Sequence, residues 1–280
     1  MKIGIFDSGI GGISVLHEAY HRLPNEEYIF YADVDHVPYG IKSSEEIKGF
    51  VDEIVGKLYG MGVDAIVIAC NTATAVGAAY VREKYDIPII GMEPAVKPAI
   101  EVAERTSGRV LVMATPVTIR ENKLHDLLVR LDTDHKVDLL PMPGLVRMAE
   151  SEIFEGADVD DYIEEQLAVF DKEKYSEVVL GCTHFNYFKP AISKAFHGKV
   201  QLIDAGNAPA HVQLHIHGLN LFVFLFQLFQ FLVQFLYRHF HIRLHDEHPS
   251  FGKKIRNYVI TNIYGFQASG CISDELKKGM

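Results

Sequence analysis

The chain has 280 residues, three cysteines and a formal net charge of −10 at pH 7. Its length is sufficient for two α/β domains, each with a hydrophobic core. The acidic balance argues against a general nucleic-acid-binding protein, which would carry a basic stripe. It does not exclude an acidic ligand, because backbone N–H groups and hydroxyls can hold a small carboxylate inside a cleft. The first residues are typical of a strand rather than a signal peptide, so we expect a cytoplasmic protein whose thiols stay free.

Strand-like and helix-like segments alternate along the first part of the chain. The hydrophobic pattern predicts strands at 2–6, 28–32, 65–69 and 87–91, and helices at 13–22, 43–60 and 72–84. This alternation predicts βαβ units and a parallel sheet. A glycine-rich turn, Asp7-Ser-Gly-Ile-Gly-Gly12, follows the first strand. Its spacing is neither that of a dinucleotide-binding loop nor that of a Walker loop, so we expect it to bring the backbone close to a small anion.

The same alternation starts again near residue 109. It predicts strands at 109–113, 136–140, 177–181 and 200–203, a helix that ends near Arg130, and helices at 145–154 and 158–170. The first strands of the two parts lead to Asp7 and Thr115, and the third strands lead to Cys70 and Cys182. The two intervals are nearly equal, which predicts a duplicated α/β unit, although short strand ends can also match by chance.

Residues 205–237 differ from the rest of the chain because they contain no Asp, Glu, Lys or Arg. Within them, 219–237 approaches the length of a membrane span, about 20 residues. Gln227, Gln230 and Gln234 share one helical face, which favours an amphipathic buried or interface helix over membrane contact. Histidines flank this segment with two His-x-His spacings, but no set of cysteines or carboxylates accompanies them, so we expect no metal site.

Cys70 and Cys182 stand in matching contexts, each at the end of an apolar run and each followed by a threonine. One interpretation is that both are small buried core residues, as free cysteines often are. The other is that two thiols face one site from the two halves of the chain. Such a pair can remove a proton from one face of a carbon atom and return a proton to the other face.

Five motifs occur in order along about three quarters of the chain. They are Gly4-Ile-Phe-Asp-Ser-Gly-Ile-Gly-Gly12, Pro38-Tyr-Gly40, Ala69-Cys-Asn-Thr-Ala73, Gly181-Cys-Thr-His184 and Leu202-Ile-Asp-Ala-Gly206. On these motifs, the chain from Met1 to about Asn207 resembles the cofactor-independent glutamate racemases of the aspartate/glutamate racemase superfamily. The segment 208–280 departs from the family pattern, and either a shift of reading frame or true divergence would account for it.

The resemblance implies two pseudo-symmetric three-layer α/β domains with mainly parallel sheets and an active site in the cleft between them. Residues 1–96 together with 208–280 would form the first domain, and 97–207 the second. The implied activity is racemisation of L-glutamate to D-glutamate, without cofactor or metal, for peptidoglycan synthesis and cell shape. Glutamate would be the partner, nucleic acid would not, and a homodimer is left open. The alternatives are a sister activity on aspartate or hydantoins, and a catalytically impaired binding protein of the same fold.

The resemblance also assigns roles to individual residues. Cys70 would abstract the α-proton and Cys182 would return one, with the roles exchanged in the reverse direction. A helix N-terminus after each cysteine would lower the pKa of its thiol. Asp7 would assist Cys70, while His184 and Glu150 would assist Cys182; a turn residue, a packed imidazole and a surface carboxylate are the respective alternatives. The implied substrate-binding residues are Ser8, Pro38, Tyr39, Gly40, Asn71, Thr72, Thr115, Thr118 and Thr183.

Overall fold

The computed structural model describes residues 1–106 and 108–204. The expectations for 208–280 lie outside the described residues. They concern the closing part of the first domain, the helix at 219–237, the histidine spacings and Cys271. Within the described part, the structure contains no helix that is both long enough and apolar enough to cross a membrane.

The first four strands form a parallel sheet in the order β2-β1-β3-β4. These strands are β1 (Lys2–Asp7), β2 (Glu27–Ala32), β3 (Ala65–Ile68) and β4 (Ile89–Gly91). They are connected through α1 (Ile13–Arg22), α2 (Ser44–Gly60) and α3 (Asn71–Lys84). Two 3₁₀ turns follow the first two strands, η1 (Ile10–Gly12) and η2 (Tyr39–Ile41).

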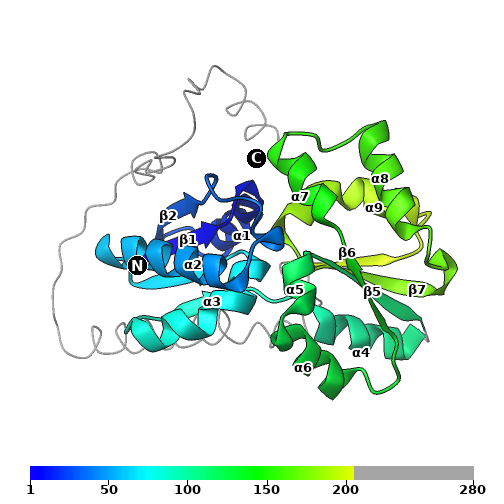
Figure 1. Cartoon of the computed structure of the whole chain (residues 1–280), viewed down its shortest axis with the longest axis horizontal. Helices are drawn as coiled ribbons and strands as arrows, with labels where there is room; N and C mark the ends of the chain where they lie inside the picture. Colours follow the sequence, from blue (N-terminus) through cyan, green and yellow to red (C-terminus); the bar gives the residue numbers. More distant parts are fainter. Residues whose placement is uncertain (107, 205–280) are drawn as a thin grey trace, which may run out of the picture.

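The second sheet repeats this plan in the order β6-β5-β7-β8, again with all strands parallel. Its strands are β5 (Arg109–Ala114), β6 (Val137–Pro141), β7 (Tyr175–Leu180) and β8 (Gln201–Ile203). Its helices are α4 (Val96–Thr106), α5 (Pro116–Arg120), α6 (Asn122–Leu131), α7 (Pro143–Glu150), α8 (Ala157–Leu167) and α9 (Lys189–Ala195), with 3₁₀ turns η3 (Lys172–Lys174) and η4 (Thr183–Phe188). Figure 1 shows the two sheets in separate lobes. The predicted α/β fold of two parallel sheets is confirmed.

Helices cover both faces of the first sheet because its strands are apolar on both faces. Successive residues of a strand point to opposite faces. Val67 of β3 therefore joins the core beneath α1, whereas Ile66 and Ile68 join the core beneath α2 and α3. Helix α2 begins at a capping box, in which Ser43 and Glu46 satisfy each other's backbone N–H groups.

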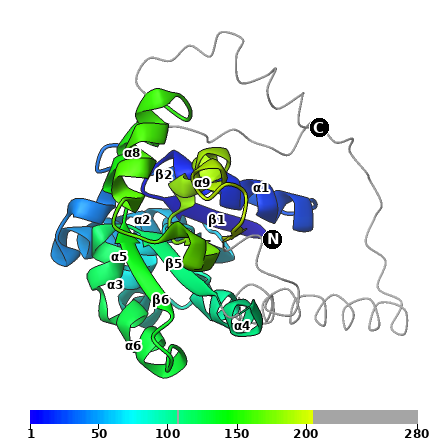
Figure 2. The same ribbon diagram turned by 90° about the vertical axis from the view of Figure 1, so that its right-hand side faces the viewer.

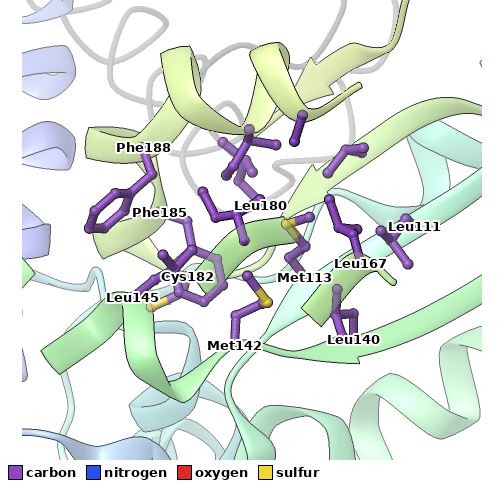
Figure 3. Packing of buried hydrophobic residues seen from close by; sticks show 14 of the residues in the cluster. Leu111, Met113, Leu140, Met142, Leu145, Leu167, Leu180, Cys182, Phe185 and Phe188 are labelled. Atoms are coloured by element: carbon purple, nitrogen blue, oxygen red, sulfur yellow. The ribbon is translucent and has the colours of Figure 1, made fainter. Parts of the chain in front are cut away.

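The second sheet is covered in the same way. Val110 and Val112 of β5 pack against α4 and α6. Leu111 and Met113 point to the other face, into a core that α7, α8 and α9 complete and that also contains Cys182 (Figure 3). Helices α8 and α9 lie side by side on this face, as the two perpendicular views show (Figure 2). Each sheet is therefore the middle of three layers.

The structure contains two helices that the sequence analysis did not predict, α4 and α9, and each carries a proline in its first turn. The helix expected to end near Arg130 is divided into α5 and α6, because Glu121 between them has an extended backbone, with φ −68° and ψ 139°. Cys182 precedes a 3₁₀ helix rather than an α-helix.

Candidate active site

Segments that follow the strand ends of the two sheets contact one another. Turn η1, after β1, packs against η4 and α7 of the second sheet, and η2 and α3 pack against α5. In open α/β sheets, ligands bind at the carboxyl ends of the strands. The structure therefore brings the strand ends of both halves, with the polar residues that follow them, to one boundary. A pocket of about 180 Å³ beside α1 reaches this boundary at Asn71, Cys182 and Thr183.

Cys70 occupies the N-cap position of α3, where its Sγ accepts a hydrogen bond from the N–H of Ala73 at 3.4 Å. Its thiol donates to Ser8 Oγ at 3.6 Å. Burial raises the pKa of the Cys70 thiol to about 12, helped by the negative charge of Asp7 and against the effect of the Ala73 N–H. The N–H of Ala73 at the helix N-terminus does lower this pKa, as expected, but the loss of solvation outweighs it and the net shift is upward.

Cys182 lies beside an imidazole, with 3.7 Å between its Sγ and His184 Nδ1. On the other side of the ring, His184 Nε2 lies 2.5 Å from Glu150 Oε1. Burial lowers the pKa of His184, but its hydrogen bonds with Cys182 and Glu150 more than compensate and raise that pKa to about 10. These hydrogen bonds favour the imidazolium form of the ring beside the second thiol. No cap hydrogen bond to Cys182 accompanies η4.

Asp7 and Glu150 tie the two halves of the chain together. Asp7 Oδ2 accepts a hydrogen bond from Thr183 Oγ1 at 3.0 Å, and Asp7 Oδ1 accepts from the Gly9 N–H at 3.1 Å. Glu150 Oε1 accepts from the Ile10 N–H at 3.0 Å. Burial raises the pKa of Asp7, despite the lowering by the charge of His184. Asp7 reaches Cys70 through Ser8, whose Oγ donates to Asp7 Oδ1 at 3.4 Å.

Three predicted binding residues form a buried cluster of hydroxyls. Thr72 Oγ1 lies 2.9 Å from Thr115 Oγ1 and 3.1 Å from Thr118 Oγ1, and Thr115 donates to Thr118 at 3.0 Å. Thr115 is also the N-cap of α5. The cluster joins the start of α3 in one half to the start of α5 in the other. Asn71 lies beside it, with its amide donating to the Met92 carbonyl at 3.5 Å.

The predicted loop at 38–40 covers this boundary. Tyr39 is buried, and its hydroxyl donates to Asp33 Oδ2 at 2.5 Å. Gly40 lies so close to Thr115 that an added Cβ would stand 2.6 Å from the threonine Cβ. Sequence reasoning did not include Asp33, although it directly follows the second strand as Asp7 follows the first. The structure shows that Asp33 holds both Tyr39 and His36.

Steric contacts explain why the turn after β1 is rich in glycine. A Cβ on Gly11 would stand 2.4 Å from Thr183 Oγ1 and 2.7 Å from the backbone nitrogen of His184. Only glycine therefore lets the backbone after β1 approach η4 of the other half. The turn serves contact between the two halves, and its residues also supply N–H groups to Asp7 and Glu150.

We expect Gly11→Ala to lower the free energy of unfolding by about 2 kcal/mol, because the Cβ overpacks a buried contact. The matched control is Gly49→Ala, at an exposed position of α2 where a Cβ meets nothing within 4 Å. That variant should gain roughly 0.5–1 kcal/mol from its higher helix propensity. Urea unfolding of both variants measures the difference, and equal stabilities would contradict the steric account.

We expect Glu150→Gln to move the alkaline limb of the pH profile of kcat/KM to lower pH by about one unit. Glutamine keeps an oxygen for the Ile10 N–H but removes the negative charge that helps to raise the pKa of His184 to about 10. The imidazolium is then lost at lower pH. Glu165→Gln, on the exposed face of α8, is the control that should leave the limb in place. An unmoved limb in Glu150→Gln would show that His184 is not the group that titrates.

Two parallel sheets with the same strand order, and a cysteine after the corresponding strand of each, define a two-domain α/β protein. Residues 13–214 match the family model described as Asp/Glu/Hydantoin racemase. The chain is 53% identical to a glutamate racemase of Lachnospira eligens over 204 residues, which is 73% of this chain and 77% of that protein. It is 50% identical to one of Campylobacter curvus over 208 residues, covering 73% and 78%.

Solved structures agree with this. The crystal structure of Escherichia coli glutamate racemase in complex with L-glutamate and the activator UDP-MurNAc-Ala matches with a TM-score of 0.68 and 32% identity, over 77% of this chain and 81% of that one. Glutamate racemase isoform RacE1 from Bacillus anthracis matches with a TM-score of 0.66 and 33% identity, over 76% and 80%. The chain therefore belongs to the Asp/Glu/hydantoin racemase family and is an isomerase.

Proposed function

We propose that this racemase interconverts L-glutamate and D-glutamate, with Cys70 and Cys182 as the two groups that exchange protons with the α-carbon. The observation that carries the proposal is the pairing of the two thiols. Each follows the third strand of its own sheet, and the sulfurs are close enough for a charge on Cys182 to raise the pKa of Cys70. Two groups are needed because inversion requires proton removal from one face of the carbon and delivery to the other.

The choice of glutamate is supported by the relatives described above, which are glutamate racemases, and by the polar groups around the thiols. Neutral hydroxyls from both halves can hold carboxylates without burying opposed charges. The implied binding residues Thr72, Thr115 and Thr118 form one such group, and Ser8 and Asn71 lie at the ends of β1 and β3.

The proposed reaction needs one thiolate and one thiol in the ground state. The thiolate takes the α-hydrogen as a proton and becomes a thiol, and the electron pair of the C–H bond remains on the substrate carbon. The second thiol then gives its proton to the opposite face and becomes a thiolate. Because the pKa of Cys70 is about 12 without substrate, its thiolate requires a positive charge from the incoming ammonium group. Cys182 has the imidazolium of His184 for the same purpose.

The proposal includes a cytoplasmic location and supply of D-glutamate to peptidoglycan synthesis. It also keeps the division into a first domain of 1–96 with 208–280 and a second of 97–207. Packing of α4 against β5 and β7 supports a boundary near residue 96.

Racemisation in D2O tests the function. We expect L-glutamate to yield D-glutamate that carries one deuterium at the α-carbon, and the reverse reaction to do the same. Mass spectrometry of the separated enantiomers measures the label. Product that retains the original hydrogen would contradict separate acid and base groups. Aspartate and a hydantoin are the parallel substrates, and faster turnover of either would overturn the choice of glutamate. Tight binding of glutamate without turnover would show a binding protein instead.

A further inference from the structure

The proposed chemistry leaves the enzyme in a different state after each turnover. If Cys70 removes a proton and Cys182 supplies one, Cys70 ends as a thiol and Cys182 as a thiolate. The enzyme is then prepared for the opposite enantiomer. A second turnover in the same direction requires one proton to travel from Cys70 to Cys182. Both residues are largely buried, with exposed fractions of 5% for Cys70 and 7% for Cys182. Cys70, unlike Cys182, does not line the pocket beside α1, so exchange of its proton with bulk water is the more restricted.

A continuous chain of hydrogen-bonding groups connects the two sulfurs inside the protein. Cys70 Sγ lies 3.6 Å from Ser8 Oγ, and Ser8 Oγ lies 3.4 Å from Asp7 Oδ1. Asp7 Oδ2 lies 3.0 Å from Thr183 Oγ1. Thr183 Oγ1 lies 3.4 Å from His184 Nδ1, which lies 3.7 Å from Cys182 Sγ. Each of these residues is buried, and the chain crosses between the halves at the contact of Asp7 with Thr183.

We propose that this chain, Ser8–Asp7–Thr183–His184, is a proton relay that returns the two thiols to their starting protonation states between turnovers. The inference rests on the proposed two-thiol function. It gives Ser8 and Thr183, which the resemblance assigns to substrate binding, a second task as hydroxyls that accept one proton and release another.

The relay balances at every step. The imidazolium of His184 gives its Nδ1 proton to the Cys182 thiolate. On the other side, Ser8 gives its hydroxyl proton to the Asp7 carboxylate and takes the proton of the Cys70 thiol. The Asp7 carboxyl so formed gives a proton to Thr183, which gives its own hydroxyl proton to the freed Nδ1 of His184. Asp7 ends as a carboxylate and His184 as an imidazolium, as they began, so the net change is one proton moved from Cys70 to Cys182.

The environments of the two ionisable groups suit this role. Burial raises the pKa of Asp7, so its carboxyl holds a proton more readily than an ordinary aspartate does. The pKa of His184 is raised to about 10, which favours the imidazolium form that can donate a proton to the Cys182 thiolate. Glu150 holds Nε2, which leaves Nδ1 as the nitrogen that faces both Thr183 and Cys182.

Thr183→Val cuts the relay because it removes the hydroxyl and keeps the shape of the side chain. Thr183→Ser is the matched control that keeps the hydroxyl.

The experiment that tests the relay is a tracer perturbation. Trace-labelled glutamate at isotopic and chemical equilibrium is mixed with a large excess of one unlabelled enantiomer, and the label is followed in both enantiomers. Slow resetting drives the label transiently away from equilibrium, because the enzyme accumulates in the form that binds only one enantiomer.

In Thr183→Val, we expect the perturbation to appear at a glutamate concentration at least about tenfold lower than in the native protein. The reason is that loss of a proton-transfer group slows the reset. Thr183→Ser should behave as the native protein does. Ser8→Ala, with Ser8→Thr as its control, cuts the relay at a second point and should give the same result.

The relay would be overturned if both cut variants showed the perturbation only at the glutamate concentration at which the native protein shows it. Failure of the proposed function itself is recognised separately, in the native protein, as absence of solvent deuterium from the product. Deuterium incorporation with an unchanged threshold would therefore remove the relay and leave the two-thiol reaction intact.

Discussion

Cys70→Ala and Cys182→Ala are each expected to lower kcat for glutamate racemisation by about 10³-fold, in both directions. Each variant lacks one of the two groups that exchange a proton with the α-carbon, and racemisation requires both in every turnover. The hydroxyl variants Cys70→Ser and Cys182→Ser should lose nearly as much, because a serine hydroxyl is a far weaker acid than a thiol. Circular dichroism of the substrate, started from each pure enantiomer, measures the rate.

The controls separate lost chemistry from lost stability. Both side chains pack in hydrophobic cores, so thermal unfolding of each variant shows whether the fold persists. Cys271→Ala changes the remaining cysteine, to which we assign no role, and should leave kcat unchanged. Native turnover in either Cys70→Ala or Cys182→Ala would rule out the paired-thiol reaction, whatever the behaviour of the other.

His184→Gln is expected to lower kcat/KM by about 10²-fold, the lower range for loss of a group that assists proton transfer. Glutamine can donate a hydrogen bond to Cys182 but carries no charge, so the Cys182 thiolate loses its neighbouring imidazolium. The loss must be equal in the two directions, because mirror-image substrates have equal free energies. His125→Gln, on the exposed face of α6, is the matched control.

Isotope effects show which thiol His184 serves. With α-deuterated substrate, His184→Gln should increase the primary isotope effect in the direction in which Cys182 removes the proton. Asp7→Asn, which changes the group beyond Ser8 on the Cys70 side, should increase it in the opposite direction. An equal increase in both directions for both variants would contradict separate partners for the two thiols.

The sequence was sufficient to predict the duplicated plan because the strands are short, apolar and followed by polar residues. Cys70 and Cys182 were placed after the third strand of each half, and the structure has identical strand orders that make β3 and β7 equivalent. Helix α9 was missed because a segment of seven residues is too short to give a clear periodic signal. Helix α4 has eleven residues with a periodic apolar pattern, and that pattern was overlooked.

The candidate site was less accessible to sequence reasoning. The pattern gathers Asp7, Thr115 and the two cysteines at strand ends, but contacts such as Thr183 with Asp7 or Glu150 with the Ile10 N–H join residues far apart in the chain. The direction of the Cys70 pKa shift also depends on burial, which the N-cap position alone does not reveal. Asp33 was overlooked because its partner, Tyr39, lies across a loop whose conformation the sequence does not specify.

The hydrogen bonds between Asp7 and Thr183 and between Glu150 and Ile10 join the halves at the same groups that surround the thiols. Separation of the two halves would therefore also separate the groups that surround the thiols. A ligand or contact that keeps the two lobes apart, even at a distant surface, would abolish activity without changing a reacting group. A ligand that binds away from the thiols could therefore change the rate of turnover. The size of the change would depend on the difference between its affinities for the two arrangements of the halves.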